Sequence, residues 1–235
     1  MALPKLTVNE YTLTVPSTQE EIKFRPFLVK EQKILMIAEE SSDEKQIASS
    51  MAKLVSDCTF ESVDAMTSPM FDIEYIFLQI RAKSVGEQVE LEVTCPDDNE
   101  TRVKVEINLS EINIQLSLEH SKSIKLTDDI ALNFRYPMMK EFENSDSAAG
   151  EFEHTMQMIY SCIESVQSGE ELIQRIDMTY DEIVEFIDSF NTTQLESVVS
   201  FFQTMPKLRH VIDIVNPKTK KKSEVLLEGL ESFLG

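Results

Sequence analysis

The spacing of apolar residues changes twice along this 235-residue chain, and these changes constrain its fold more than any single motif does. Between Val85 and Pro137, apolar side chains recur at every second position, as is typical of half-buried antiparallel strands. Before and after this region they recur at steps of three and four, which indicates amphipathic helices. The sequence therefore predicts an α+β protein.

The first segment, residues 1–84, is predicted to contain a β-hairpin followed by helices. Residues 7–15 and 20–27 are rich in β-branched and aromatic side chains and flank the turn-forming "PSTQ". A helical pattern begins at Val29. A second helix is predicted from a single apolar stripe, which consists of Ile47, Met51, Leu54, Val55 and Cys58. A third helix is expected to start with Ser68 as N-cap and Pro69 in its first turn, and to end near Gly86.

The second segment, residues 85–140, is predicted to be a β-rich insert. "EQVELEVTC" and "TRVKVEINL" alternate apolar and polar residues around the turn "PDDNE", which predicts a hairpin. "HSKSIKLTDDIALNFRYP" repeats this arrangement around Asp128 and Asp129. "ENSDSAAG", residues 143–150, is small and polar and is interpreted as a loop or the lead-in to a helix.

The last segment, residues 141–235, is predicted to be helical and to close with a hairpin; it either stands alone or forms one domain with residues 1–84. One helical stripe is expected to contain Phe152, Met156, Ile159, Ile163 and Val166. Two capping boxes are predicted, Thr179 with Glu182 and Thr193 with Glu196. Alternating runs on both sides of "NPKTKKK" predict the closing hairpin. No internal repeat of fixed period is evident.

The excess of acidic over basic residues indicates which classes of partner are unfavourable. The chain has 22 Lys and Arg against 42 Asp and Glu, a formal net charge of −20, so its surface repels nucleic acid and anionic membranes. It contains no apolar run of about 20 residues and no signal-peptide core at its start, which predicts a cytoplasmic protein. The three cysteines are odd in number and far apart, so no disulfide framework is expected.

The sequence contains no recognisable catalytic or metal-binding pattern. Its three histidines lie in no nucleophile signature, and five glycines are too few for a Gly-rich phosphate loop. Cys95 lacks a second thiolate three positions later, because Asp98 stands there. We therefore expect no enzyme activity, no cofactor and no metal; an enzyme with an unrecognised site and a generic cytoplasmic adaptor are the alternatives.

The stretch from Glu21 to Glu44 is the candidate partner-binding site. It joins apolar anchors to basic side chains within an acidic chain, and the predicted binding residues are Phe24, Arg25, Phe27, Lys30 and Lys33. The competing interpretation places Phe24 and Phe27 in the core and pairs Arg25 with one of the chain's own carboxylates. The lysines of "NPKTKKK" are interpreted either as a solvated hairpin tip or as an electrostatic handle for an acidic partner.

Four stretches carry a family resemblance: "KFRPFLVKEQKILMIAEE", "VELEVTCPDDNETRVKVEINLSEI", "IALNFRYP" and "NPKTKKKSEVLLEGLESFL". Through these four stretches, the chain resembles the baseplate hub proteins of T-even-like, contractile-tailed bacteriophages over most of its length. Members of that family tend to carry Cys-Pro-x-Cys at the middle turn, whereas this chain has Cys95 and Pro96 followed by two aspartates.

The resemblance implies a role in tail assembly rather than chemistry. It implies a baseplate hub component, or a chaperone-like factor that helps the hub or the tape measure protein to assemble. The implied partners are other phage tail or baseplate hub proteins, with the tape measure protein as a further candidate. The implied location is the host cytoplasm during assembly, with the protein either released before completion or retained in the virion tail.

Overall fold

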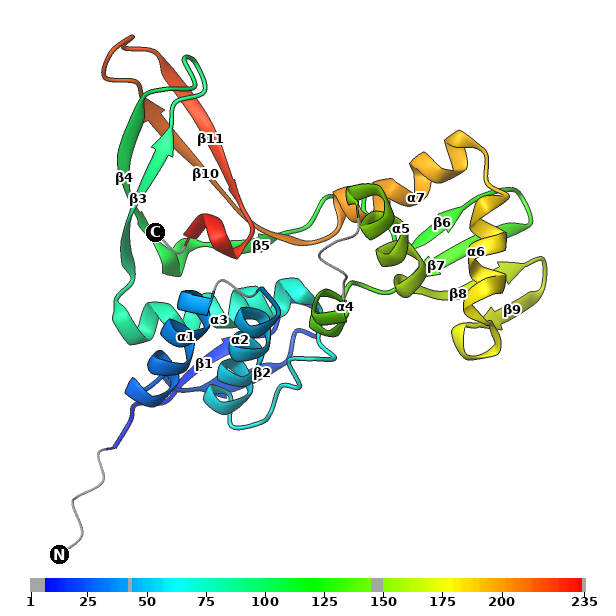
Figure 1. Cartoon of the computed structure of the whole chain (residues 1–235), viewed down its shortest axis with the longest axis horizontal. Helices are drawn as coiled ribbons and strands as arrows, with labels where there is room; N and C mark the ends of the chain where they lie inside the picture. Colours follow the sequence, from blue (N-terminus) through cyan, green and yellow to red (C-terminus); the bar gives the residue numbers. More distant parts are fainter. Residues whose placement is uncertain (1–6, 42–43, 145–149, 234–235) are drawn as a thin grey trace, which may run out of the picture. The chain divides into compact units, whose positions relative to one another are not determined.

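The computed structural model describes residues 7–41, 44–144 and 150–233 (Figure 1). The chain forms two compact units: residues 1–115 together with 207–235, and residues 116–206. The predicted α+β class is confirmed. The division into segments 1–84, 85–140 and 141–235 stays a prediction. Within the described residues, no helix is both long enough and apolar enough to cross a bilayer.

The first unit begins with the predicted hairpin and helices. Strands β1 (Tyr11–Thr14) and β2 (Glu21–Phe24) are antiparallel, and Leu13 faces Ile22. The helices that follow are α1 (Val29–Ser41), α2 (Glu44–Cys58) and α3 (Met70–Val85). The largest fully buried side chains of α3 are Ile73, Ile76, Leu78 and Ile80. This helix therefore lies at the centre of the unit's core.

The start of α3 differs from the prediction. Pro69, with φ −53° and ψ 139°, is the N-cap, and no side chain caps the helix. Ser68 does not cap because its hydroxyl donates to the carbonyl of Asp64 at 2.7 Å. The proline is therefore one position earlier relative to the helix than we predicted.

Two hairpins complete the first unit, as predicted. They are β3 (Gln88–Thr94) with β4 (Arg102–Asn108), and β10 (Lys207–Val215) with β11 (Lys222–Glu228). A short strand that the sequence did not predict, β5 (Asn113–Gln115), pairs with β10. Two 3-10 turns, η1 (Leu109–Glu111) and η3 (Leu230–Phe233), contribute buried side chains. The unit thus joins segments from both ends of the chain.

The second unit is a four-stranded antiparallel sheet with helices. Its strand order is β6 (Ser123–Lys125), β7 (Ile130–Phe134), β8 (Ile163–Ser168) and β9 (Glu171–Gln174). The other elements are α4 (Met139–Asn144), α5 (Glu151–Cys162), η2 (Arg175–Asp177), α6 (Tyr180–Asp188) and α7 (Thr192–Thr204). Its core gathers Leu132, Phe134, Ile159, Val198 and Phe201. This unit therefore has its own hydrophobic core.

The sequence prediction for the helix that precedes β8 is corrected. The expected single stripe from Phe152 to Val166 is wrong, because α5 ends at Cys162 and both Ile163 and Val166 lie in β8. Ile163 is β-branched and extended, with φ −65° and ψ 124°, and a register shift in the pairing at Asn133 and Phe134 lets Ile163 and Val166, three residues apart, both reach the core. Residues 145–149 of the predicted loop lie outside the described part.

Of the two predicted capping boxes, one is confirmed and one is wrong. The box of Thr179 and Glu182 is confirmed at α6. At α7 the box is Asn191 with Gln194, not Thr193 with Glu196. Asparagine is a strong N-cap, because its side-chain oxygen accepts the Gln194 N–H at 3.0 Å. The helix therefore starts two residues earlier than the Thr193 cap implied.

Candidate functional site

An arginine–glutamate clasp holds the junction between β2 and α1 in the first unit. The backbone N–H of Arg25 donates to the carbonyl of Cys58 at 2.9 Å, which joins the end of β2 to the end of α2. The Arg25 guanidinium donates to Glu31 Oε1 at 2.8 Å. The other oxygen of Glu31 accepts the N–H of Leu28 at 2.8 Å. One buried ion pair therefore fixes the direction in which α1 leaves the sheet.

The electrostatics of this clasp favour the charged pair. Glu31 is 3% exposed, and burial by itself raises the pKa of its carboxyl. Hydrogen bonds from Arg25, Leu28 and Lys30 outweigh burial, so the net pKa of Glu31 lies below its usual value. Removing one partner of such a pair leaves a buried charge uncompensated. Arg25 is therefore committed to the chain's own fold.

The second unit contains the same clasp. The N–H of Arg135 donates to the carbonyl of Cys162 at 2.9 Å. Its guanidinium donates to Glu141 Oε1 at 2.9 Å, and Glu141 Oε2 accepts the N–H of Met138 at 2.6 Å. Each of these contacts has its counterpart in the first unit.

The repeat extends to the hairpin that precedes each clasp. In β1–β2 Leu13 faces Ile22, and in β6–β7 Ile124 faces Leu132. Each hairpin ends in a buried phenylalanine immediately before the arginine, Phe24 or Phe134. The chain therefore contains two copies of one module, consisting of a hairpin, a clasp and helices ending at a cysteine. The sequence concealed this repeat because the turns and helices of the two copies differ in length.

The structure divides the predicted partner-binding residues into two groups. Phe24 is 2% exposed and Arg25 belongs to the clasp, while Phe27 is half-buried and its N–H donates to Ser84 Oγ at 2.9 Å. Lys30 and Lys33 are exposed on α1. The first three therefore hold the junction together, and the two lysines are accessible. Partner binding by this set stays a prediction.

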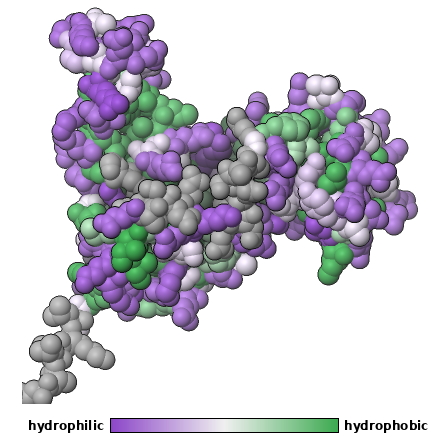
Figure 2. Space-filling model, viewed as in Figure 1, coloured by the Kyte–Doolittle hydropathy of each residue, from purple (hydrophilic) through white to green (hydrophobic). Residues whose placement is uncertain are grey.

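The outward face of α1 is apolar as well as basic. Four of its large apolar side chains are between 43% and 65% exposed: Val29, Ile34, Met36 and Ile37. The inward side of the helix carries the buried Glu31 and Ala38. Figure 2 shows an apolar patch over α1 among hydrophilic neighbours. We call Val29, Lys30, Lys33, Ile34, Met36 and Ile37 the α1 face.

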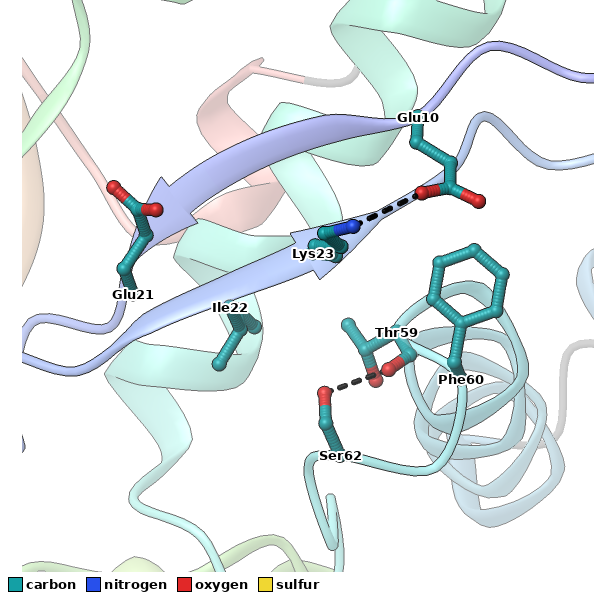
Figure 3. Close-up of a pocket in the computed structure, with 7 residues that line it drawn as sticks. All are labelled: Glu10, Glu21, Ile22, Lys23, Thr59, Phe60 and Ser62. Carbon is teal, nitrogen blue, oxygen red and sulfur yellow. Dashed lines mark hydrogen bonds and ion pairs between the residues drawn. The ribbon is translucent and has the colours of Figure 1, made fainter.

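An open groove runs beside β2 (Figure 3). Its lining comes from β1–β2 and from the turn after α2, and consists of Glu10, Glu21, Ile22, Lys23, Thr59, Phe60 and Ser62. Lys23 Nζ lies 3.5 Å from Glu10 Oε2. Phe60 is 49% exposed and has a left-handed φ of 56°. An exposed aromatic side chain on such a backbone is unusual, and the sequence did not reveal it.

The middle turn contains no metal centre among the described residues. Asp98 accepts hydrogen bonds from Thr101 and Asn216, and these bonds lower the pKa of its carboxyl. Asp97 accepts from Asn216 at 2.9 Å and from Thr219 at 2.5 Å. The aspartates therefore join the tip of the β3–β4 hairpin to the tip of the β10–β11 hairpin. This contact also orders the turn that carries Lys218.

Burial is the main cause of the shifted pKa values of Cys58, Cys162 and His120. Burial raises the pKa of Cys58 to about 11 and that of Cys162 to about 12, so both stay as thiols. His120 Nδ1 lies 3.0 Å from Thr204 Oγ1, and its ring stacks against Tyr136. Burial and then Lys122 lower the pKa of His120. Burial thus keeps both thiols protonated and disfavours the charged form of the His120 imidazole.

The family described as T4 bacteriophage base plate protein matches residues 8–235. The chain therefore belongs to this family, and it is a phage baseplate protein. No curated protein and no solved structure matches it.

Proposed function

We propose that this protein is a non-enzymatic component of the baseplate hub, or a factor that assembles the hub with the tape measure protein. It acts by binding other tail proteins through the α1 face. Assembly takes place in the host cytoplasm. This proposal rests on the baseplate family and on the physical character of that face.

The observation that carries the proposal is an exposed apolar helix face on a rigid support. Burying a large aliphatic side chain fully contributes about 1.5–3 kcal/mol, so four such side chains offer a substantial interface core. The clasp fixes the first turn of α1, which limits the entropy lost when a partner binds. The α1 face is thus prepared for association before a partner arrives.

The charge of the α1 face indicates the chemistry of the partner. Lys30 and Lys33 are exposed there, in a chain with a net charge of −20. A partner with apolar side chains flanked by carboxylates would match this face, and the remaining acidic surface would repel most other acidic proteins. We therefore expect an acidic, amphipathic surface on the hub or tape measure protein.

The test is co-purification of the full chain with the hub and tape measure proteins encoded by the same phage. Ile37→Asp places a charge in the α1 face, and Lys33→Glu reverses a charge there. The matched controls are Ile176→Asp, at a position 92% exposed in the second unit, and Lys218→Glu at the hairpin tip. We expect at least a tenfold loss of affinity for the α1 variants and none for the controls. Equal binding by all four variants would contradict the proposal.

A second measurement separates the two roles. A hub component is present at fixed stoichiometry in purified virions, whereas an assembly factor is present in assembly intermediates and absent from virions. Quantitative mass spectrometry of both preparations distinguishes them. A protein that binds neither hub nor tape measure protein in intermediates would contradict both roles.

A further inference from the structure

The two copies of the repeated module differ at one edge of their hairpins. In the second unit, the chain continues directly from Cys162 into β8, which pairs antiparallel with β7. Leu132 faces Val166 in that pairing. In the first unit, the chain turns away after Cys58, because Phe60 and Glu61 both adopt left-handed φ angles, 56° and 61°. Within the described part of the chain, the β2 edge therefore has no strand equivalent to β8.

The backbone groups along this edge are oriented for pairing. The N–H of Val15 donates to the carbonyl of Glu20 at the hairpin turn, so Glu20, and with it Ile22 and Phe24, direct their backbone groups towards β1. Glu21, Lys23 and Arg25 consequently direct theirs away from β1. Of these outward N–H groups, that of Arg25 donates to Cys58. Among the described residues, no hydrogen bond to the backbone of Glu21 or Lys23 occupies this edge.

We propose that the β2 edge binds an extended segment of another tail protein, which adds antiparallel to β2 in the position that β8 takes beside β7. Strand addition is a general mode of peptide recognition, in which backbone hydrogen bonds give affinity and alternate side chains give specificity. The occupant is expected to place an apolar residue opposite Ile22, as Val166 lies opposite Leu132. Phe60 is exposed at the side of the groove with its ring towards Glu10 and Lys23, where it can pack against a neighbouring residue of the occupant (Figure 3).

The strain in the turn after α2 supports this assignment. A left-handed conformation costs a residue with a side chain roughly 1–2 kcal/mol, and two such residues occur in succession. The turn directs the chain away from the edge and leaves the Phe60 ring half-exposed beside it. An unpaired strand edge is a template for another strand, and the exposed aromatic side chain beside this one fits a binding role, although the short β2 also carries the charged Glu21 and Lys23.

The test uses a synthetic peptide with the sequence of β8, Ile-Glu-Ser-Val-Gln-Ser, which occupies the equivalent edge in the second unit. NMR titration of the full chain is expected to give saturable shifts at the amides of Glu21 and Lys23. A peptide with proline in place of its glutamine is expected to give none, because the equivalent residue, Gln167, directs its backbone N–H towards β7 opposite Ala131, and proline removes this ladder donor.

The matched variants isolate the backbone edge. Lys23→Pro removes an N–H that points away from β1, so it blocks strand addition without removing a bond within the hairpin. Lys23→Ala removes only the side chain and its contact with Glu10. Thr12→Pro makes the same backbone change on the opposite edge of the hairpin. We expect the Glu21 shift to be lost in Lys23→Pro and retained in the other two.

Two outcomes would overturn the proposal. The first is the absence of saturable shifts at the β2 edge, or equal shifts in Lys23→Pro. The second is a concentration-dependent shift of the same amides without peptide, which would assign the edge to a second copy of this chain. The proposal shares with the proposed function only the premise that the protein acts by association. Ile37→Asp should leave the titration unchanged, so the two can fail separately.

Discussion

The two copies of the repeated module have the same arginine–glutamate clasp. They differ in whether the edge of the hairpin and the start of the following helix are covered by other parts of the chain. Beside β7 the chain supplies its own strand, β8, and the residue that follows Met138 in the second clasp, Met139, is fully buried. Beside β2 no strand follows, and the residue at the corresponding position, Val29, is 65% exposed. The same local contacts therefore occur in two different settings. We call the copy in the second unit closed, because β8 pairs with β7, and the copy in the first unit open, because no such strand follows beside β2. The shared clasp is expected to provide stability in both copies, and the surfaces that only the first copy leaves exposed are those for which we propose binding.

The largest expected effect comes from breaking a clasp. Arg25→Ala leaves Glu31 buried without its strongest partner, so we expect a loss of about 3–5 kcal/mol in the free energy of unfolding. Arg135→Ala should also destabilise, because Arg135 makes the equivalent contacts to Glu141. Urea unfolding measures both. Lys30→Ala is the control, since Lys30 is two-thirds exposed, and a loss in Arg25→Ala no larger than in this control would refute the clasp as a stabilising element.

A core substitution comes next in size. Leu54 on α2 is 3% exposed, and Leu54→Ala should cost about 2–5 kcal/mol through lost burial and a residual cavity. Ile37→Ala on the α1 face is the matched surface change, expected to alter stability by about 0.5 kcal/mol or less. If Ile37→Ala is as costly as Leu54→Ala in thermal or urea unfolding, the α1 face is part of the core.

The free energy of unfolding of the first unit should also depend on pH, through Glu74 on α3. Burial raises the pKa of Glu74 to about 7, and a hydrogen bond from the Leu230 backbone opposes this only in part. The folded pKa of Glu74 lies above its ordinary value of 4.5. The contribution of Glu74 to the free energy of unfolding is therefore fully present below pH 4.5 and is lost as pH rises through 7. We expect a fall of about 1–3 kcal/mol over this window. Glu74→Gln should flatten the profile between pH 4.5 and 7 relative to the wild type; an unchanged slope would exclude Glu74 as its source.

The smallest effect concerns the position three residues after each cysteine. Glu61 has a left-handed φ of 61°, so Glu61→Gly should stabilise the fold by about 0.5–1 kcal/mol. Ser165 lies within β8 and accepts a hydrogen bond from Asn133 at 3.0 Å, so Ser165→Gly should destabilise by about 1 kcal/mol or more. Thermal unfolding of the pair should give changes of opposite sign. Changes of the same sign would argue against the divergence between the two copies.

The sequence predicted the elements that local patterns determine. Alternation located β3–β4 and β10–β11, and Thr179 with Glu182 located the start of α6. It failed where tertiary pairing decides the outcome. Ile163 and Val166 fit a helical stripe, but pairing with β7 makes them a strand. Local periodicity contains no information about that partner strand.

The candidate site was only partly predictable for a related reason. The sequence identified the Phe24–Lys33 region, but it could not assign Arg25 to a carboxylate six residues away or decide which side of α1 is outward. A usable signal was present: Phe-Arg, a proline within two residues, and Lys-Glu occur in both "FRPFLVKE" and "FRYPMMKE". Aligning these two stretches would have revealed the repeat, though not which copy is open.

The most direct test of the open and closed copies is hydrogen–deuterium exchange of the full chain, alone and in complex with its co-purified hub or tape measure protein. We predict that the complex gains protection along α1 and at the amides of Glu21 and Lys23, and that exchange in β7 and β8 stays unchanged. Protection gained in β7 and β8 with none in α1 or β2 would contradict the account.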